Sequence, residues 1–148
     1  MKENAFRITI CALLCISIIT IACLSIYISV FQAKEMTKYV SIENVSNIHV
    51  STKVPETNQK FEFNLTNDEM QNLIKLMQSS RIKRMLRKEY IDAVGFSLTF
   101  TYSDGSTIDV LYLNNIKIGN NWYQIYGYVF EYVYETDSYK LAYESAKV

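Results

Sequence analysis

A segment of 24 residues without a charged side chain, residues 8–31, constrains the structure of this chain more than any other feature. At a rise of about 1.5 Å per residue, a helix of that length spans about 36 Å, which is enough to cross a hydrocarbon core of about 30 Å. The core helices of soluble proteins are seldom apolar on every face over such a distance. The sequence therefore predicts a transmembrane anchor at residues 8–31, preceded by a short N-terminal tail at residues 1–7.

The apolar segment has three interpretations, which differ in whether it is retained. A cleaved secretory signal is disfavoured because the apolar region of such signals is usually about 7–15 residues long, and no small-x-small cleavage site follows the segment. A bacterial lipoprotein acylated at Cys23 is the second alternative, since Ala22 precedes this cysteine, but Thr20 stands where such motifs usually carry leucine. We favour an uncleaved signal anchor that remains as a single transmembrane helix, with the lipoprotein as the alternative.

The orientation of the anchor follows from its flanks only in part. Lys2 and Arg7 precede the apolar segment, and Lys34 and Lys38 follow it. Because the positive-inside rule counts these basic residues, and they are almost balanced, the rule decides little here. The short N-terminal tail is the simpler end to leave in the cytoplasm, so we expect the C-terminal domain to be extracytoplasmic at the cell membrane.

All three cysteines, Cys11, Cys15 and Cys23, lie inside the apolar segment. The rest of the chain therefore has no disulfide framework and no thiolate metal site. Cys11 and Cys15 are four residues apart and share one helix face. We expect both to be small apolar residues that face lipid or a partner helix, with a disulfide-linked dimer or palmitoylation as alternatives.

Residues 32–43 mix charged and polar side chains, and we expect them to form a stalk that leads to one domain at residues 44–148. Alternation of apolar and polar residues predicts strands at residues 45–50, 60–65, 95–102, 107–113, 116–118 and 122–126. Thr66 and Glu69 match a capping box, and the apolar spacing that follows predicts an amphipathic helix over residues 68–79. Asp-Gly at residues 104–105 predicts a hairpin with a primed turn.

The C-terminal residues 128–147 carry both a strand period and a helix period in their tyrosines, and their length and Ala/Glu/Lys content favour a helix. The fold class that follows is α+β: a transmembrane helix, then an antiparallel sheet of hairpins with one or two packed helices. The order of strand, capped helix, and hairpins containing "FSLTFTYSDGSTIDVLYL" and "IKIGNNWYQI" behind one membrane segment resembles small extracytoplasmic modules of unknown function in Gram-positive bacteria. These modules are carried on membrane anchors or as lipoproteins, and the resemblance transfers no catalytic residues.

Few residues of this chain suit catalysis. His49 is the one histidine, and it cannot form the usual His/Cys zinc site without cysteines outside the apolar segment. No Gly-x-Ser-x-Gly motif presents a serine nucleophile, and the four glycines are scattered rather than gathered in a phosphate loop. Asp104 and Asp109 could pair as acid and base, but the turn accounts for Asp104. We therefore expect a non-catalytic protein that needs no cofactor and no metal.

Two clusters are candidate binding sites. The first is basic and consists of Arg81, Lys83, Arg84, Arg87 and Lys88. It is expected to be a solvated helix end followed by a loop, where cations are favoured by the helix dipole. Alternatively, it contacts an anionic surface, either lipid headgroups or a wall polymer, or an acidic partner protein. Net charge gives no support for nucleic acid as a partner.

The second cluster is aromatic and lies near the C-terminus. Most of its rings are expected to pack in the core. An exposed subset, Trp122, Tyr123 and Tyr126, could form a platform for a peptide or a glycan, because tyrosine and tryptophan supply large contact area at low entropic cost.

These patterns together predict a single-pass membrane protein that displays a small domain outside the cell. Its expected work is binding, in the form of sensing, scaffolding or self-protection against a secreted toxin. The expected partners are the lipid bilayer and a membrane protein, a peptide or a cell-wall polymer. The alternatives are an accessory subunit of a membrane complex and a cell-wall-directed hydrolase.

Overall fold

The computed structural model describes residues 2–86 and 95–147, and the chain forms two units, Met1–Gln32 and Ala33–Val148. The first unit is the helix α1 (Lys2–Phe31). Its part Ile10–Phe31, 22 residues long, is apolar enough and long enough to cross a membrane. This helix agrees with the predicted anchor in position and length.

Two hydroxyl side chains inside α1 bond to the helix backbone. The Ser17 hydroxyl donates to the Leu13 carbonyl at 2.9 Å, and the Thr20 hydroxyl donates to the Ile16 carbonyl at 2.8 Å. Hydroxyls that bond one turn back leave no free donor on the helix surface. Ser17 and Thr20 therefore have partners within the helix, which lowers the cost of placing their hydroxyls in an apolar environment.

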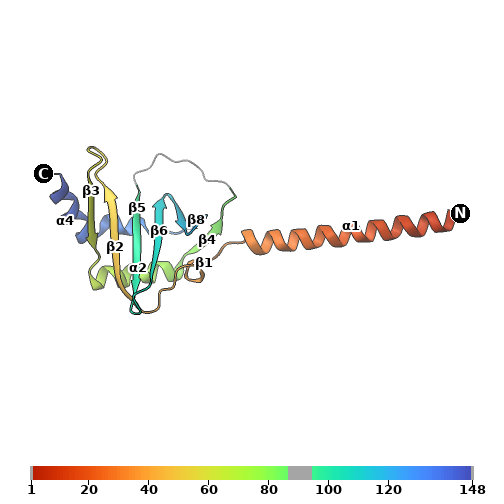
Figure 1. Ribbon diagram of the computed structural model, residues 1–148, viewed down its shortest axis with the longest axis horizontal. Coiled ribbons are helices and arrows are strands. Elements are labelled where there is room, and N and C mark those ends of the chain that lie inside the picture. Colours follow the sequence, from red (N-terminus) through yellow and green to blue (C-terminus); the bar gives the residue numbers. More distant parts are fainter. Residues whose placement is uncertain (1, 87–94, 148) are drawn as a thin grey trace. The chain divides into compact units, whose positions relative to one another are not determined.

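The second unit is built on an eight-stranded antiparallel sheet with the strand order β1-β4-β8-β7-β6-β5-β2-β3. Figure 1 shows the sheet with helices packed against it. The strands are β1 (Lys34–Glu35), β2 (Val45–Lys53), β3 (Lys60–Asn64), β4 (Arg81–Arg84), β5 (Phe96–Tyr102), β6 (Thr107–Leu113), β7 (Asn115–Ile118) and β8 (Asn121–Tyr126). Together with the helices they form the predicted α+β fold.

One face of the sheet is covered and the other is open. In β5 the residues Phe96, Leu98, Phe100 and Tyr102 are buried, and the residues between them are half-buried serines and threonines. Side chains of a strand alternate between faces, so the buried set marks the covered face. The helices α2 (Asn67–Ser79), α3 (Glu131–Glu135) and α4 (Asp137–Ala146) lie on this side (Figure 1).

The helix α2 begins where the sequence predicts. The backbone N–H of Thr66 donates to the Glu69 carboxylate at 2.8 Å, and the backbone N–H of Glu69 donates to the Thr66 hydroxyl oxygen at 3.4 Å, which completes the capping box. Its buried residues are Met70, Leu73, Ile74 and Met77. Their spacing of three and four residues places them on one side of the helix, against the sheet.

The C-terminal segment is helical rather than extended, and it breaks at Thr136. The Thr136 hydroxyl donates to the Val133 carbonyl at 2.7 Å and accepts the backbone N–H of Tyr139 at 3.2 Å. One side chain therefore closes α3 and caps α4. The two helices then meet different parts of the sheet, since Val133 joins the main core and Ala146 packs with Phe61 of β3.

The stalk predicted at residues 32–43 is instead part of the folded unit. It contains β1 and the short helix η1 (Met36–Lys38), and the side chains of Met36 and Val40 are fully buried. These two residues are four apart, so one turn places both against the core. The prediction was wrong because polar neighbours surround the two apolar residues in the sequence.

Two other local predictions also need correction. Residues 81–84 form the strand β4, although a helix end and loop were expected there. In the β5–β6 hairpin, Gly105 has a φ of +82°, but Asp104 keeps a negative φ. A type I′ turn needs positive φ at both central residues, so this connection is a type I turn closed by glycine.

Candidate binding surface on the open face of the sheet

Basic and aromatic residues from three strands meet on the open face. The sheet register places Arg81 opposite Tyr126 across β4 and β8, and Lys117 opposite Trp122 across β7 and β8. Lys83 lies two residues after Arg81 and shares its face. These five residues, Arg81, Lys83, Lys117, Trp122 and Tyr126, form what we call the basic-aromatic patch. The two clusters that the sequence analysis treated separately therefore share one surface.

The charge of this patch is mainly positive. Arg81 and Lys83 are exposed, and Lys117 is half-buried. The Arg81 guanidinium donates one hydrogen bond to the Ala33 carbonyl at 3.2 Å, which holds that end of β4. Glu35 lies opposite Arg81 in the register and brings one negative charge to the same face. Asp109 shares this face and lines a depression together with Lys117. Three cations against these two acids leave one net positive charge around the two rings.

Arg84 and Tyr123 do not belong to this surface. Alternation along β4 and β8 turns both toward the covered face, where the register pairs them. The Arg84 guanidinium donates to the Asn121 side-chain oxygen at 2.6 Å. Tyr123 is 4% exposed, and its ring centroid lies 4.8 Å from that of Tyr39. Burial raises the pKa of the Tyr123 hydroxyl. Tyr123 is therefore a core residue and not part of an exposed platform.

The remaining predicted basic residues, Arg87 and Lys88, lie outside the described residues. Lys117 was missed because it is a lone cation between two isoleucines. The signal that could have revealed it is the two-residue turn at Gly119 and Asn120, since a two-residue hairpin sets the register of both strands. Drawing that register brings Lys117 to Trp122.

A second polar group lies on the open face at the β2–β3 end. The His49 imidazole Nδ1 is 3.0 Å from the Asn64 side-chain oxygen, and Nε2 is 3.5 Å from the Glu62 carboxylate. The Ser51 hydroxyl donates to the same carboxylate at 3.2 Å. In a Ser-His-acid triad the imidazole stands between hydroxyl and carboxylate. Here the carboxylate stands between them, so the arrangement does not activate Ser51 as a nucleophile.

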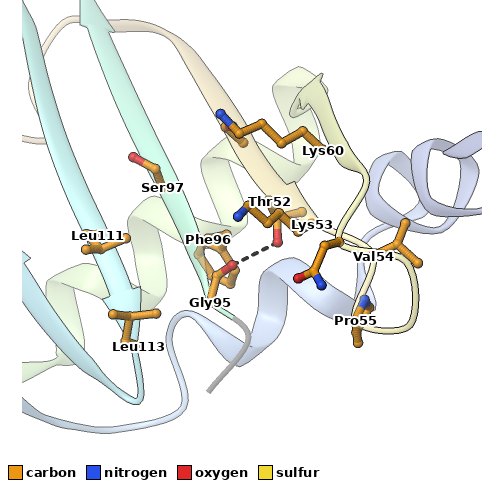
Figure 2. A pocket seen from close by; sticks show the side chains of 12 residues that line it. Thr52, Lys53, Val54, Pro55, Lys60, Gly95, Phe96, Ser97, Leu111 and Leu113 are labelled. Carbon is orange, nitrogen blue, oxygen red and sulfur yellow. Dashed lines mark hydrogen bonds between the residues drawn. The ribbon is translucent and has the colours of Figure 1, made fainter. Parts of the chain in front are cut away.

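A cavity of about 510 Å³ opens beside this group, where the β2–β3 loop, the start of β5 and the end of β6 meet. Figure 2 shows Lys53, Lys60, Ser97, Leu111 and Leu113 among its lining residues. Its wall thus combines cationic, hydroxyl and apolar side chains. Within residues 2–86 and 95–147, no group of three or more His, Cys, Asp or Glu side chains is placed to hold a metal ion.

Comparison with known proteins gives no relatives. The chain matches no protein-family model, no curated protein and no solved structure. The likeness to Gram-positive extracytoplasmic modules therefore stays a prediction, and the site has to be interpreted from its own chemistry.

Proposed function

We propose that this chain is a single-pass membrane protein whose folded unit is a non-catalytic binding domain outside the cell, with the basic-aromatic patch as its binding surface. The observation that carries the proposal is the cross-strand register that brings Arg81, Lys83, Lys117, Trp122 and Tyr126 to one open face. The apolar helix Ile10–Phe31 supports the membrane anchor.

The chemistry of the patch favours a ligand rich in phosphodiester groups. Arginine and lysine donate charge-assisted hydrogen bonds to phosphate oxygens, and arginine does so with two parallel bonds. Trp122 and Tyr126 add flat apolar area with a polar edge, which suits the carbon skeleton between phosphates. Anionic wall polymers and anionic lipid headgroups share this phosphodiester chemistry, and we propose that the patch binds it.

Trp122 is the one tryptophan of the chain and reports on the patch directly. The full-length protein would be placed in nanodiscs of neutral lipid and titrated with poly(glycerol phosphate) while tryptophan emission and acrylamide quenching are recorded. The same measurement in nanodiscs containing phosphatidylglycerol, without added polymer, tests the lipid as the source. Binding should shield Trp122 from quenching, and high salt should reverse the effect because it screens exposed charges.

The variant for this test is Lys83→Gln combined with Lys117→Gln, and the matched control is Lys75→Gln on the exposed side of α2. We expect the double variant to lose most of the shielding and the control to retain it. Shielding in the polymer titration identifies a wall polymer, and shielding only in anionic nanodiscs identifies lipid. No change of Trp122 quenching in either experiment would reject the patch as a phosphodiester site.

The orientation is tested separately with Ser145→Cys, which lies near the end of α4 and is exposed to solvent. A membrane-impermeant thiol reagent should label this cysteine in intact cells. Labelling that appears only after lysis would place the domain in the cytoplasm and would contradict the proposed location.

A further inference from the structure

The cavity at the β2–β3 end of the open face has the size of a ligand site. It is about 510 Å³ in volume and is lined from the β2–β3 loop, β5 and β6 (Figure 2). Sites for small molecules in proteins usually occupy about 300–1,000 Å³. The cavity and the basic-aromatic patch have no residue in common, but they border each other, because Leu111 of the cavity lies opposite Lys117 of the patch in the β6–β7 register.

The walls of the cavity are held by close backbone approaches. A β-carbon at Gly95 would lie 1.9 Å from the Tyr112 carbonyl oxygen and 2.4 Å from a methyl carbon of Leu113, so only glycine fits between β5 and β6 there. The Thr52 hydroxyl donates to the Gly95 carbonyl at 2.8 Å and ties β2 to the same point. The three strands around the cavity are therefore fixed before any ligand arrives, which lowers the entropic cost of binding.

The mouth of the cavity carries two lysines that form no ion pair with the described residues. Lys53 and Lys60 are direct cross-strand neighbours in the β2–β3 register. Like charges directly opposite each other destabilise a strand pair. Over the described ranges 2–86 and 95–147, neither ammonium group has an acidic side chain within ion-pair distance. The two ammonium groups repel each other in the free protein, and an anion bound between them would replace this repulsion with attraction to both.

One acid limits the charge of a suitable anion. Glu62 lies on the same face two residues after Lys60, and it is held by Ser51 and His49. Two lysines against one carboxylate leave a single net positive charge at the mouth. A ligand with one negative charge matches this balance, whereas a dianion would be repelled by Glu62.

The cavity has an apolar side on β6. Leu111 and Leu113 line it there, on the same face as Ser97 of the neighbouring strand. Leucine is unusual on this face, where the neighbouring strand β5 presents Ser97, Thr99 and Thr101. The leucines therefore provide an apolar floor behind the cationic mouth, and the hydroxyl of Ser97 lies beside it as a further hydrogen-bond partner.

From these observations we infer a second binding site, which takes a small organic monocarboxylate with an apolar chain or ring. The carboxylate lies between Lys53 and Lys60, and the apolar body rests on Leu111 and Leu113. The site shares no residue with the basic-aromatic patch, so the variants that test it differ from those that test the proposed function.

Phenylbutyrate is a suitable probe, and phenylbutyramide is its uncharged counterpart. Binding of each to the full-length protein in neutral nanodiscs would be measured by equilibrium dialysis, with empty nanodiscs subtracted. We expect saturable binding of the carboxylate and at least about tenfold weaker binding of the amide, since a charged hydrogen bond contributes that factor or more. The variant Lys53→Gln/Lys60→Gln should weaken carboxylate binding by a similar factor.

Two further variants separate the site from general effects of charge. Leu113→Ser should weaken both the carboxylate and the amide, because it removes apolar contact that both probes use. Lys75→Gln on α2 should change neither affinity. Equal affinity for acid and amide, unchanged binding by the lysine double variant, or no saturable binding of phenylbutyrate would each overturn the inference.

Discussion

Replacing Glu69 with alanine should destabilise the folded unit through two helices at once. The Glu69 carboxylate accepts the Thr66 backbone N–H at the start of α2. It also accepts the backbone N–H of Ser138 at 3.0 Å and the Ser138 hydroxyl at 2.5 Å. Ser138 lies in the first turn of α4, whose N–H groups have no partner within that helix. One carboxylate therefore caps α2 and α4 together.

The expected cost follows from these contacts. Loss of an N-terminal cap costs about 1 kcal/mol. Hydrogen bonds to a charged group contribute about 1.5–3 kcal/mol, which we reduce to about 1 kcal/mol for the Ser138 pair because Glu69 is only half-buried. The sum is about 2 kcal/mol, or about 8 °C in Tm for a domain of roughly 100 residues.

The assay is urea unfolding of the full-length protein in detergent, followed by the fluorescence of Trp122. Asp68→Ala is the matched control, because Asp68 is an exposed acid in the same first turn that interacts with the helix dipole. A double-mutant cycle with Ser138→Ala should give a coupling energy of about 1 kcal/mol. The reasoning is refuted if Glu69→Ala costs no more than Asp68→Ala, or if the cycle shows no coupling.

The Glu69 carboxylate should also make the stability of the folded unit depend on pH in the acidic range. Burial by itself raises the pKa of Glu69, but hydrogen bonds from Ser138 and Thr66 outweigh burial and leave the pKa below its ordinary value of 4.5. The contribution of Glu69 to stability is therefore fully present above pH 4.5 and is lost as the pH falls through the folded-state pKa. The difference in stability between the parent and Glu69→Gln should shrink over that range.

Three further predictions concern other parts of the sheet and its helices. Gly95→Ala should cost about 1–3 kcal/mol in urea unfolding, because its β-carbon would lie 1.9 Å from the Tyr112 carbonyl oxygen. Burial raises the pKa of Tyr134 from 10.0 to about 12, so its contribution to stability should hold below pH 10 and decline between pH 10 and about 12, as urea midpoints across pH will show. Lys53→Glu should raise the free energy of unfolding by about 0.2–1 kcal/mol, since the new carboxylate faces Lys60 across the strand pair.

Each of these predictions has a control within the chain. Gly105→Ala adds a methyl group to open space at a φ of +82°, so it costs stability without crowding. A loss of unfolding free energy at Gly95 no larger than the loss at Gly105 would argue against crowding at Gly95. Tyr134→Phe should reduce the loss of stability above pH 10. If the loss is unchanged in this variant, it comes from other groups. Lys75→Glu on α2 should leave the free energy of unfolding almost unchanged. A gain in this variant equal to the gain in Lys53→Glu would indicate a general effect of charge.

Local patterns were sufficient for much of the fold. The capping box at Thr66 and Glu69 predicted the start of α2, because both partners lie within one turn of chain. The hairpin around Gly105 was predicted for the same reason, although its turn type was not. In contrast, β4 was missed, since a short run of exposed basic residues around Ile82 carries little strand signal until β8 pairs with it.

The candidate sites depended more strongly on pairing between distant strands. The sequence named Arg81, Lys83, Trp122 and Tyr126 but treated them as two clusters, and it named neither Lys117 nor the pair of Lys53 and Lys60. It also included Tyr123, which the structure buries against Tyr39. Which face a side chain occupies follows from strand register, and a shift of one residue would exchange the two faces.

The sequence by itself determined the apolar helix near the N-terminus, the amphipathic helix α2 and the hairpins, because each depends on residues close together along the chain. Only the tertiary structure decided that Met36 and Val40 join the core, that β4 pairs with β8, and that Glu69 reaches Ser138. These contacts join residues that are far apart in sequence. Their formation depends on the burial of shared apolar surface, which no local window of sequence contains.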